Sequence, residues 1–241
     1  MESDRILKLQ EIIGNGKRIV FFTGAGVSTD SGIPDFRSQD GLYAMKYAYP
    51  PEEIISHHFF LEHPTEFYDF YRDKMLILDA KPNATHKLMA DLEAKGKCLG
   101  VVTQNIDGLH TAANSKHVYE LHGSVLRNYC TKCHKFYSAE EIKNSTGIPT
   151  CECGGIIKPD VVLYEEPLDT DTFSNAVRAI SMADVLIVLG TSLVVYPAAS
   201  LLNYFNGEHL VLINRSVTPY DNKADLVIQG SFADIFPKLH A

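Results

Sequence analysis

Four cysteines stand in two close pairs, Cys130/Cys133 and Cys151/Cys153, on either side of residues 134–150. Two pairs of thiolates at such a distance are typical of a closed, tetrahedral, structural zinc site. The second pair has one intervening residue where two are usual, so we expect a tighter loop there. A redox dithiol is the alternative, but the presence of two pairs favours zinc.

A glycine-rich turn, Gly24-Ala25-Gly26, follows the apolar run at residues 18–22 after the single residue Thr23. Glycine has no Cβ, so backbone N–H groups in such a turn can approach a phosphate closely. The full dinucleotide fingerprint has a third glycine where this chain has Thr29, so the motif is a variant. The turn predicts a phosphate cradle, and a tight turn that binds no ligand is the equal alternative.

A short loop after this turn brings together an acid, an aromatic and a base, at Asp35, Phe36 and Arg37. Arg37 could neutralise phosphate charge, and Phe36 could shield a reactive centre from water. In the alternative interpretation, Phe36 is a core residue and Asp35 and Arg37 form an ion pair on the surface.

A polar cluster, which includes Gln104, Asn105 and Asp107, follows a second apolar run at residues 98–102. A helix N-cap by Asn105 or Asp107 would explain one of these residues, but not the whole cluster. Farther along, His122 precedes Gly123, and an imidazole has the pKa that general-base catalysis near neutral pH requires. We therefore expect chemistry at these positions.

The elements that must position these residues alternate along the chain. Short apolar runs predict buried strands at residues 18–22, 98–102, 185–189, 210–213 and 225–228. Helical spacing predicts helices at residues 3–13, 83–95 and 171–182. Apolar strands that alternate with helices indicate an α/β fold with a parallel sheet covered on both faces, and such sheets bind ligands at the carboxyl ends of their strands.

Two segments break this alternation. Residues 38–82 are rich in aromatics and prolines with helical patches, and residues 124–160 hold the paired cysteines and several glycines. We predict that both are insertions that form a small helical and zinc-binding domain. The large domain would then be discontinuous, built from residues 1–37, 83–123 and 161–241.

The composition is that of an ordinary globular protein, with 45% hydrophobic and 22% charged residues. A net charge of -8 argues against direct binding to nucleic acid. No apolar stretch is long enough to span a membrane, and the charged N-terminus lacks the apolar core of a signal peptide. We therefore expect a cytoplasmic protein, because closely paired cysteines in a reducing compartment are more often metal ligands than disulfides.

Taken together, these segments resemble the sirtuin family. The matching motifs occur in the family's order over nearly the whole chain: Gly24-Ala25-Gly26-Val27-Ser28, Gly32-Ile33-Pro34-Asp35-Phe36-Arg37, Thr103-Gln104-Asn105-Ile106-Asp107, His122-Gly123, the four cysteines, Pro159 with Val161-Val162, Gly190-Thr191-Ser192-Leu193 and Ile213-Asn214. The resemblance implies a Rossmann-like large domain and a small zinc domain, with NAD and an acyl-lysine in the cleft between them.

The resemblance also implies roles for individual residues. His122 would be the general base, and Asn105 would position the ribose or a water. Val162 would offer its backbone carbonyl to the acyl-lysine N–H, with the peptide pairing as an added strand. Asp107 counts with His122 and Asn105 as catalytic. The cofactor-binding set would comprise Gly24, Ala25, Gly26, Thr29, Asp35, Phe36, Arg37, Gln104, Asn105, Ile106, Asp107, His122, Gly190, Thr191, Ser192, Asn214 and Phe232.

The implied activity is NAD-dependent deacylation of protein lysines, which releases nicotinamide and O-acyl-ADP-ribose. No arginine lies three residues after Tyr68 or Tyr71, so the Tyr-x-x-Arg pair of sirtuins that favour succinyl-lysine is missing and acetyl or another neutral acyl group is expected. The family often has Phe-Gly-Glu where this chain has Tyr164-Glu165-Glu166, and Phe232 is bulkier than the residue usual near adenine. Alternatives are a protein mono-ADP-ribosyltransferase and a non-enzymatic, NAD-sensing zinc-ribbon module. A dehydrogenase is less favoured, because hydride transfer does not require an inserted segment with four cysteines.

Overall fold

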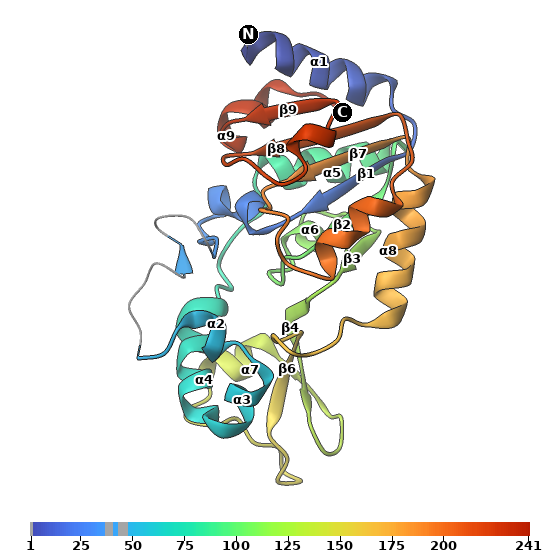
Figure 1. The fold of residues 1–241 in the computed structure, drawn as a ribbon. Helices are drawn as coiled ribbons and strands as arrows, with labels where there is room; N and C mark the ends of the chain where they lie inside the picture. The colour runs from blue at the N-terminus through green and yellow to red at the C-terminus, as the bar shows by residue number, and fades with distance from the viewer. Residues whose placement is uncertain (1, 37–40, 43–47) are drawn as a thin grey trace.

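The chain folds into a large part above a smaller one in the orientation of Figure 1. The computed structural model describes residues 2–36, 41–42 and 48–241. The large part contains a six-stranded sheet, and the smaller part contains a three-stranded sheet with short helices beside it. Within the described residues, no helix has the length and apolar character needed to cross a bilayer.

The large sheet is parallel throughout, and its strand order is β3-β2-β1-β7-β8-β9. Its strands are β1 (Ile19–Thr23), β2 (Cys98–Thr103), β3 (Val118–Glu120), β7 (Val185–Leu189), β8 (His209–Asn214) and β9 (Leu226–Gln229). The five predicted strands are confirmed. Strand β3 was not predicted, because a short edge strand that is only half-buried has no continuous apolar run.

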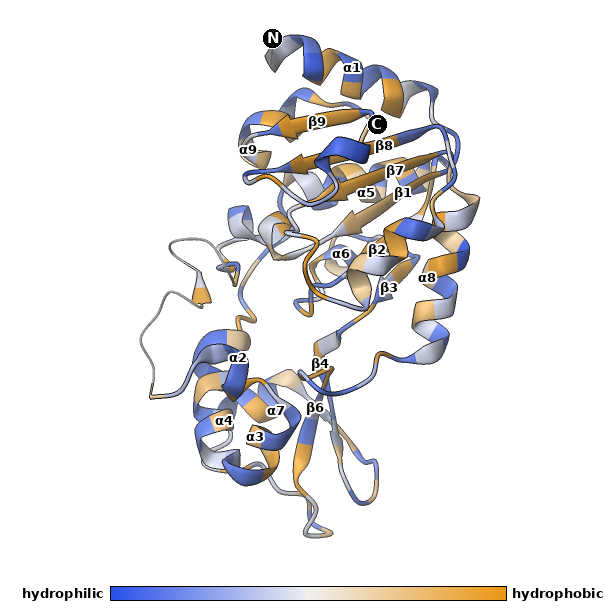
Figure 2. Ribbon diagram, in the orientation of Figure 1, coloured by the Kyte–Doolittle hydropathy of each residue, from blue (hydrophilic) through white to orange (hydrophobic). Residues whose placement is uncertain are grey.

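Helices cover both faces of this sheet, so the predicted α/β class is confirmed. One face packs against α1 (Glu2–Asn15), α5 (Ala84–Ala94) and α9 (Phe232–Ile235). The other face packs against α8 (Thr170–Met182) and the 3-10 helix η4 (Ala198–Tyr204). Figure 2 shows the strands of the large sheet as mostly hydrophobic, as expected for strands that are buried on both faces.

The N-terminus of α5 is tied to the glycine-rich turn. Asn83 caps the helix, because its side chain accepts from the N–H groups of Thr85 and His86, at 2.9 and 3.4 Å. The Asn83 side-chain amide also donates to the Val27 carbonyl at 2.8 Å. This one side chain therefore both starts the helix and holds the segment that follows β1.

The smaller part is built from both inserted segments. Its antiparallel sheet has the order β5-β4-β6, and its helices precede and flank that sheet. One apolar core contains Phe67 and Tyr71 from the first segment and Ile142 and Ile157 from the second. The elements are α2 (Pro51–Ile54), α3 (His57–Glu62), α4 (Pro64–Phe70), the π-helix η3 (Tyr71–Met75), β4 (Gly123–Cys130), β5 (Phe136–Ser138), α7 (Ala139–Asn144) and β6 (Ile157–Val161). The limits of the two domains remain a prediction.

Short helical elements complete the described fold. They are η1 (Ala25–Ser31), α6 (Leu109–Ala112), η5 (Asp221–Lys223) and η6 (Phe236–Lys238). Of these, η1 follows β1 directly, and α6 follows the polar cluster after β2. Both therefore lie close to the carboxyl edge of the sheet.

The turns that follow β1 and β7 pack backbone against backbone. A Cβ on Gly24 would lie 2.8 Å from the Gly190 carbonyl oxygen, and one on Gly26 would lie 2.8 Å from the Gly190 Cα. Gly190 itself has φ +60, and a Cβ there would lie 2.6 Å from the Val27 nitrogen. These contacts between two turns already require the glycines, before any ligand is considered.

We predict that Gly190→Ala destabilises the protein more than Gly32→Ala. Gly32 also has a positive φ, +85, but nothing lies within 4 Å of its added Cβ. The left-handed backbone costs each variant about 1–2 kcal/mol, and overpacking adds about 1–3 kcal/mol at position 190 alone. Urea unfolding gives the free energy of unfolding of both variants. Equal losses of that free energy would contradict the close packing of the two turns.

Candidate active site and metal centre

A cavity of about 370 Å³ lies at the carboxyl edge of the large sheet, where it meets the smaller part. A volume of this size suits a cofactor or a small ligand. The lining residues come from the turns after β1, β2, β7 and β8 and from the loop after β6. Of the residues predicted to bind cofactor, the structure places these in the lining: Gly24, Ala25, Gly26, Thr29, Asp35, Phe36, Gln104, Asn105, Ile106, Asp107, His122, Gly190, Thr191, Ser192, Asn214 and Phe232.

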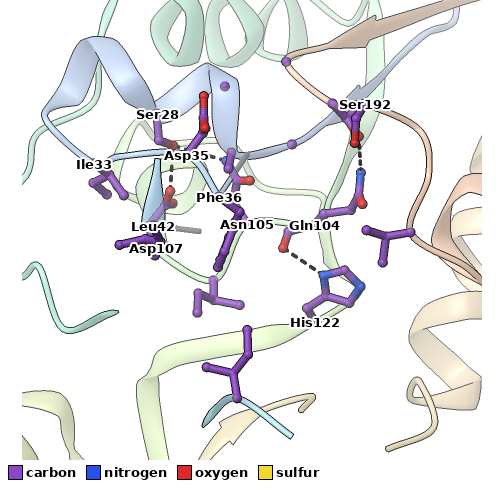
Figure 3. Close-up of a pocket in the computed structure, with 18 of the residues that line it drawn as sticks. Ser28, Ile33, Asp35, Phe36, Leu42, Gln104, Asn105, Asp107, His122 and Ser192 are labelled. Carbon is purple, nitrogen blue, oxygen red and sulfur yellow. Dashed lines mark hydrogen bonds between the residues drawn. The ribbon is translucent and has the colours of Figure 1, made fainter. Parts of the chain in front are cut away.

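His122 is held by one hydrogen bond that defines its tautomer. Its Nδ1 lies 3.0 Å from the Gln104 carbonyl oxygen, as Figure 3 shows. A carbonyl can only accept, so Nδ1 carries the proton and Nε2 keeps a lone pair. Burial lowers the pKa of His122, and the bond to Gln104 partly opposes that shift. The ring is therefore neutral at neutral pH and able to accept a proton at Nε2.

Asp107 and Asn105 meet at Ser28. The Ser28 hydroxyl donates to Asp107 Oδ2 at 2.6 Å, and the Asn105 side-chain amide donates to the same hydroxyl at 3.2 Å. Burial raises the pKa of Asp107, and its bonds from Ser28 and from the Leu109 N–H lower it in part. The result is a chain of hydrogen-bonded polar side chains in the lining of the cavity, with Asn105 at one end.

Hydrogen bonds also link the strand ends across the sheet. The Gln104 side-chain amide donates to Thr191 Oγ1 at 3.0 Å, and the Asn214 amide donates to the Thr191 carbonyl at 3.2 Å. Thr29 Oγ1 donates to the Gly26 carbonyl at 2.9 Å, which closes the first turn. The side chains at the ends of β2, β7 and β8 therefore form one connected wall.

The loop residues Asp35, Phe36 and Ile106 line the cavity, and Phe36 and Ile106 also pack against the apolar core of the smaller part. The interpretation of Phe36 as a core residue and its interpretation as a cavity-lining residue are therefore compatible. Arg37 lies outside the described residues. Phe232 lines the cavity too, yet it is a core residue, 2% exposed, that meets Phe236 edge to face.

Val162 connects the histidine to the smaller part. Its N–H donates to the His122 carbonyl at 3.0 Å, and Gly123 pairs with Val161 in the β4–β6 ladder. Gly123 has φ +73, and a Cβ there would lie 1.9 Å from the Asp160 carbonyl oxygen. The glycine after the histidine is required because the two strands approach closely at that point.

The Tyr164-Glu165-Glu166 segment keeps its turn without a glycine. Glu165 has φ +77, and its carboxylate accepts from the His58 N–H at 3.1 Å and lies 2.8 Å from His58 Nδ1. Glu166 lies 2.8 Å from His57 Nδ1 and accepts from Lys158 Nζ at 3.0 Å. Side-chain contacts to α3 therefore hold the loop in a conformation that glycine usually provides.

Several residues that line the cavity had no role predicted from the sequence. Ser28 is the clearest case, because it links Asn105 and Asp107, and its only sequence signal is its place after the glycine-rich turn. The apolar residues Ile33, Leu42, Met75 and Leu163 also line the cavity. A sequence pattern cannot separate such residues from ordinary core.

The four paired cysteines converge in the smaller part. Their Sγ atoms all lie within 4.8 Å of one another, with Cys130 and Cys153 at 3.3 Å and Cys133 and Cys151 at 3.6 Å. Four thiolates arranged in this way fit a tetrahedral zinc ion with Zn–S bonds of about 2.3 Å. The cluster lies outside the set of cavity-lining residues, as a structural site requires.

The tight second pair is accommodated by the glycines after it. The Cys151 N–H donates to the Gly155 carbonyl at 2.8 Å, and Gly154 has φ +75. A Cβ on Gly155 would lie 2.5 Å from Cys130 Sγ. The expected tight loop is therefore present, and glycine allows the thiolates to approach the backbone.

We predict that Cys130→Ala removes the metal and unfolds the smaller part, because a structural zinc site is coupled to folding. Elemental analysis should fall from about one zinc per chain to background, with loss of near-UV circular dichroism. Cys98→Ala is the control, since Cys98 is buried in the large part and should leave the zinc content unchanged. A folded, active, metal-free Cys130→Ala protein would contradict the assignment.

A family model and several named proteins match most of this chain. The model of the Sir2 family matches residues 24–197. A Clostridium acetobutylicum protein named NAD-dependent protein deacetylase is 58% identical over 236 residues and covers 96% of each chain. A Staphylococcus aureus protein of the same name is 46% identical over 233 residues, again 96% of each chain.

A solved structure is similar over the same extent. It holds a variant Sir2 with a deacetylated p53 peptide and 3'-O-acetyl-ADP-ribose, and it matches with a TM-score of 0.89 at 40% identity, covering 96% of each chain. The matched residues include the glycine-rich turn, the polar cluster, His122 and the paired cysteines. The resemblance to sirtuins is confirmed, and the chain belongs to the Sir2 family.

Proposed function

We propose that this protein is an NAD-dependent protein-lysine deacetylase with His122 as its general base. The observation that supports this most directly is the hydrogen bond from His122 Nδ1 to the Gln104 carbonyl. That bond leaves a basic Nε2 on a neutral imidazole in the wall of the cavity. Relatives at 46–58% identity carry the same activity in their names, over nearly the full chain.

NAD fits the cavity through the glycine turns and the polar wall. Gly24, Ala25 and Gly26 would hold the pyrophosphate, while Thr191, Ser192 and Asn214 would hold the adenosine end. When bound, NAD supplies a ribose carbon that accepts the acyl group as nicotinamide leaves. Asn105, fixed by Ser28, would orient the ribose or a water, and Asp107 and Ile106 would contact the nicotinamide.

The protein's own side chains would complete the chemistry. His122 Nε2 would take a proton from a ribose hydroxyl, with the Gln104 carbonyl stabilising the imidazolium at Nδ1. Phe36 would keep water from the reacting carbon, since it lines the cavity. The Val162 carbonyl would accept the acyl-lysine N–H, and the Val162 N–H already anchors that strand to His122.

We propose acetyl or another neutral acyl group as the one removed. Apolar side chains line much of the cavity, among them Phe36, Ile106 and Leu163. Lys74 also lines it, but its ammonium lies 2.9 Å from the Asp73 carboxylate, so its charge is paired. We also propose a cytoplasmic location, because a reducing compartment keeps the four thiols free of disulfides and able to bind zinc.

His122→Ala should lower the deacetylation rate by about 10²–10⁴, the usual contribution of a general base. Nicotinamide release with an acetylated peptide measures it, and thermal unfolding checks that the fold persists. His240→Ala is the matched control, because His240 is exposed near the C-terminus. Wild-type rates in the His122 variant would reject the assignment.

The pH dependence should follow the lowered pKa of His122. The base acts in its neutral form, so activity is complete above this pKa and is lost as pH falls through it. Because burial holds that pKa below the ordinary value of about 6.5, the midpoint of the fall in kcat/KM on the acid side should lie below about pH 6.5. A loss of activity that begins above neutrality would contradict this prediction.

Labelled NAD separates the rival activities. A deacetylase should release nicotinamide only with acetylated peptide and leave no label on protein. A mono-ADP-ribosyltransferase would leave label on protein while acetyl-lysine persists, and a non-enzymatic NAD-sensing module would bind NAD without turnover. Either of these two outcomes would overturn the proposed function.

A further inference from the structure

Two buried histidines lie beside the catalytic loop and have no part in the reaction described above. His86, on α5, is 0% exposed, and His110, on α6, is 2% exposed. Their ring centroids are 4.8 Å apart. Buried polar groups are normally hydrogen-bonded, so each of the four ring nitrogens should have a partner.

Two of the four nitrogens have partners that define their protonation. The Asn83 N–H donates to His86 Nδ1 at 3.3 Å, so Nδ1 is an acceptor and the proton of a neutral ring lies on Nε2. The Thr23 hydroxyl donates to Thr103 Oγ1 at 2.8 Å, so its oxygen must accept from His110 Nε2, 3.0 Å away. Both rings therefore carry a proton on Nε2, and burial keeps His110 neutral, so that its Nδ1 is unprotonated.

The other two nitrogens are complementary. Among the described residues, His86 Nε2 and His110 Nδ1 are buried without a partner. By the assignment above, the first is a donor and the second an acceptor, and they belong to adjacent rings. A direct hydrogen bond from His86 Nε2 to His110 Nδ1, or one buried water bonded to both, would satisfy both atoms.

We propose that His86 and His110 form one directional chain of hydrogen bonds that positions the catalytic loop. It runs from Asn83 through both imidazoles to Thr23 and Thr103. It ends at the loop itself, because Thr103 Oγ1 also accepts from the Asn105 N–H at 3.0 Å. The two histidines are positioning residues, and their effect on the reaction rests on the proposed deacetylase function.

The surroundings of the rings are consistent with neutral imidazoles. Burial lowers the pKa of His86 to about 4, and burial together with the neighbouring His86 lowers that of His110 to about 3. A second proton on either ring would place a donor against another donor and break the chain. The direction of the chain is therefore part of how the loop is held.

Nitrogen-15 NMR of the imidazoles in the full-length wild-type protein tests the assignment without any assay of activity. Both His86 and His110 should show the Nε2-protonated tautomer and should not titrate between pH 5.5 and 8. His122 serves as the internal comparison, because its bond to Gln104 requires the opposite tautomer. An Nδ1-protonated or titrating ring at position 86 or 110 would overturn the proposal.

Two variants then test the positioning role. His110→Gln keeps an N–H that can reach Thr23, whereas His110→Leu removes it. We expect His110→Leu to lower kcat by about 10- to 100-fold, with His110→Gln close to wild type and the KM for NAD similar in both. If both variants lost kcat equally while their urea midpoints stayed similar, the positioning role of His110 would be overturned. If the wild-type protein itself were inactive, the proposed deacetylase function would be rejected instead.

Discussion

Parallel register is the constraint on which this molecule's site depends. Thr23 at the end of β1 pairs with Thr103 at the end of β2 and with Leu189 at the end of β7. Three loops that are far apart in sequence therefore leave the sheet side by side. The apolar strands are held by burial between two helical layers, so the loops carry polar groups without supporting the core.

The smaller part forms the side of the cavity that faces the large sheet. Two sets of hydrogen bonds hold it against that sheet. The Val162 N–H donates to the His122 carbonyl, which joins the end of β6 to the segment that carries His122. Arg127 on β4 spans the same junction, because it donates to Glu120 on β3 at 2.8 Å and to Asp160 on β6 at 2.7 Å. The thiolate cluster lies farther away and stabilises the fold of this wall.

At Glu165, tertiary contacts overcome the local preference of a non-glycine residue for a negative φ. A left-handed conformation costs a residue with a Cβ about 1–2 kcal/mol, and this chain has no glycine there to avoid it. His58 offsets that cost with its N–H and its ring, and the neighbouring pair of His57 and Glu166 repeats the arrangement. This cavity-lining loop is thus held by side chains of α3.

The sequence alone predicted five strands of the large sheet, the helices α1, α5 and α8, the glycine turns and the four thiolates, and it suggested His122 as a general base. Apolar runs, cysteine spacing and polar residues at strand ends are local signals, and each reflects burial or ligand chemistry that residue types carry with them. Only the tertiary structure decided the rest. It explained Gly24, Gly26 and Gly190 by the contact of two turns, gave Ser28 its link between Asn105 and Asp107, and set the tautomer of His122. Such facts depend on groups that are distant in sequence and meet only after the sheet has formed, so no local pattern can contain them.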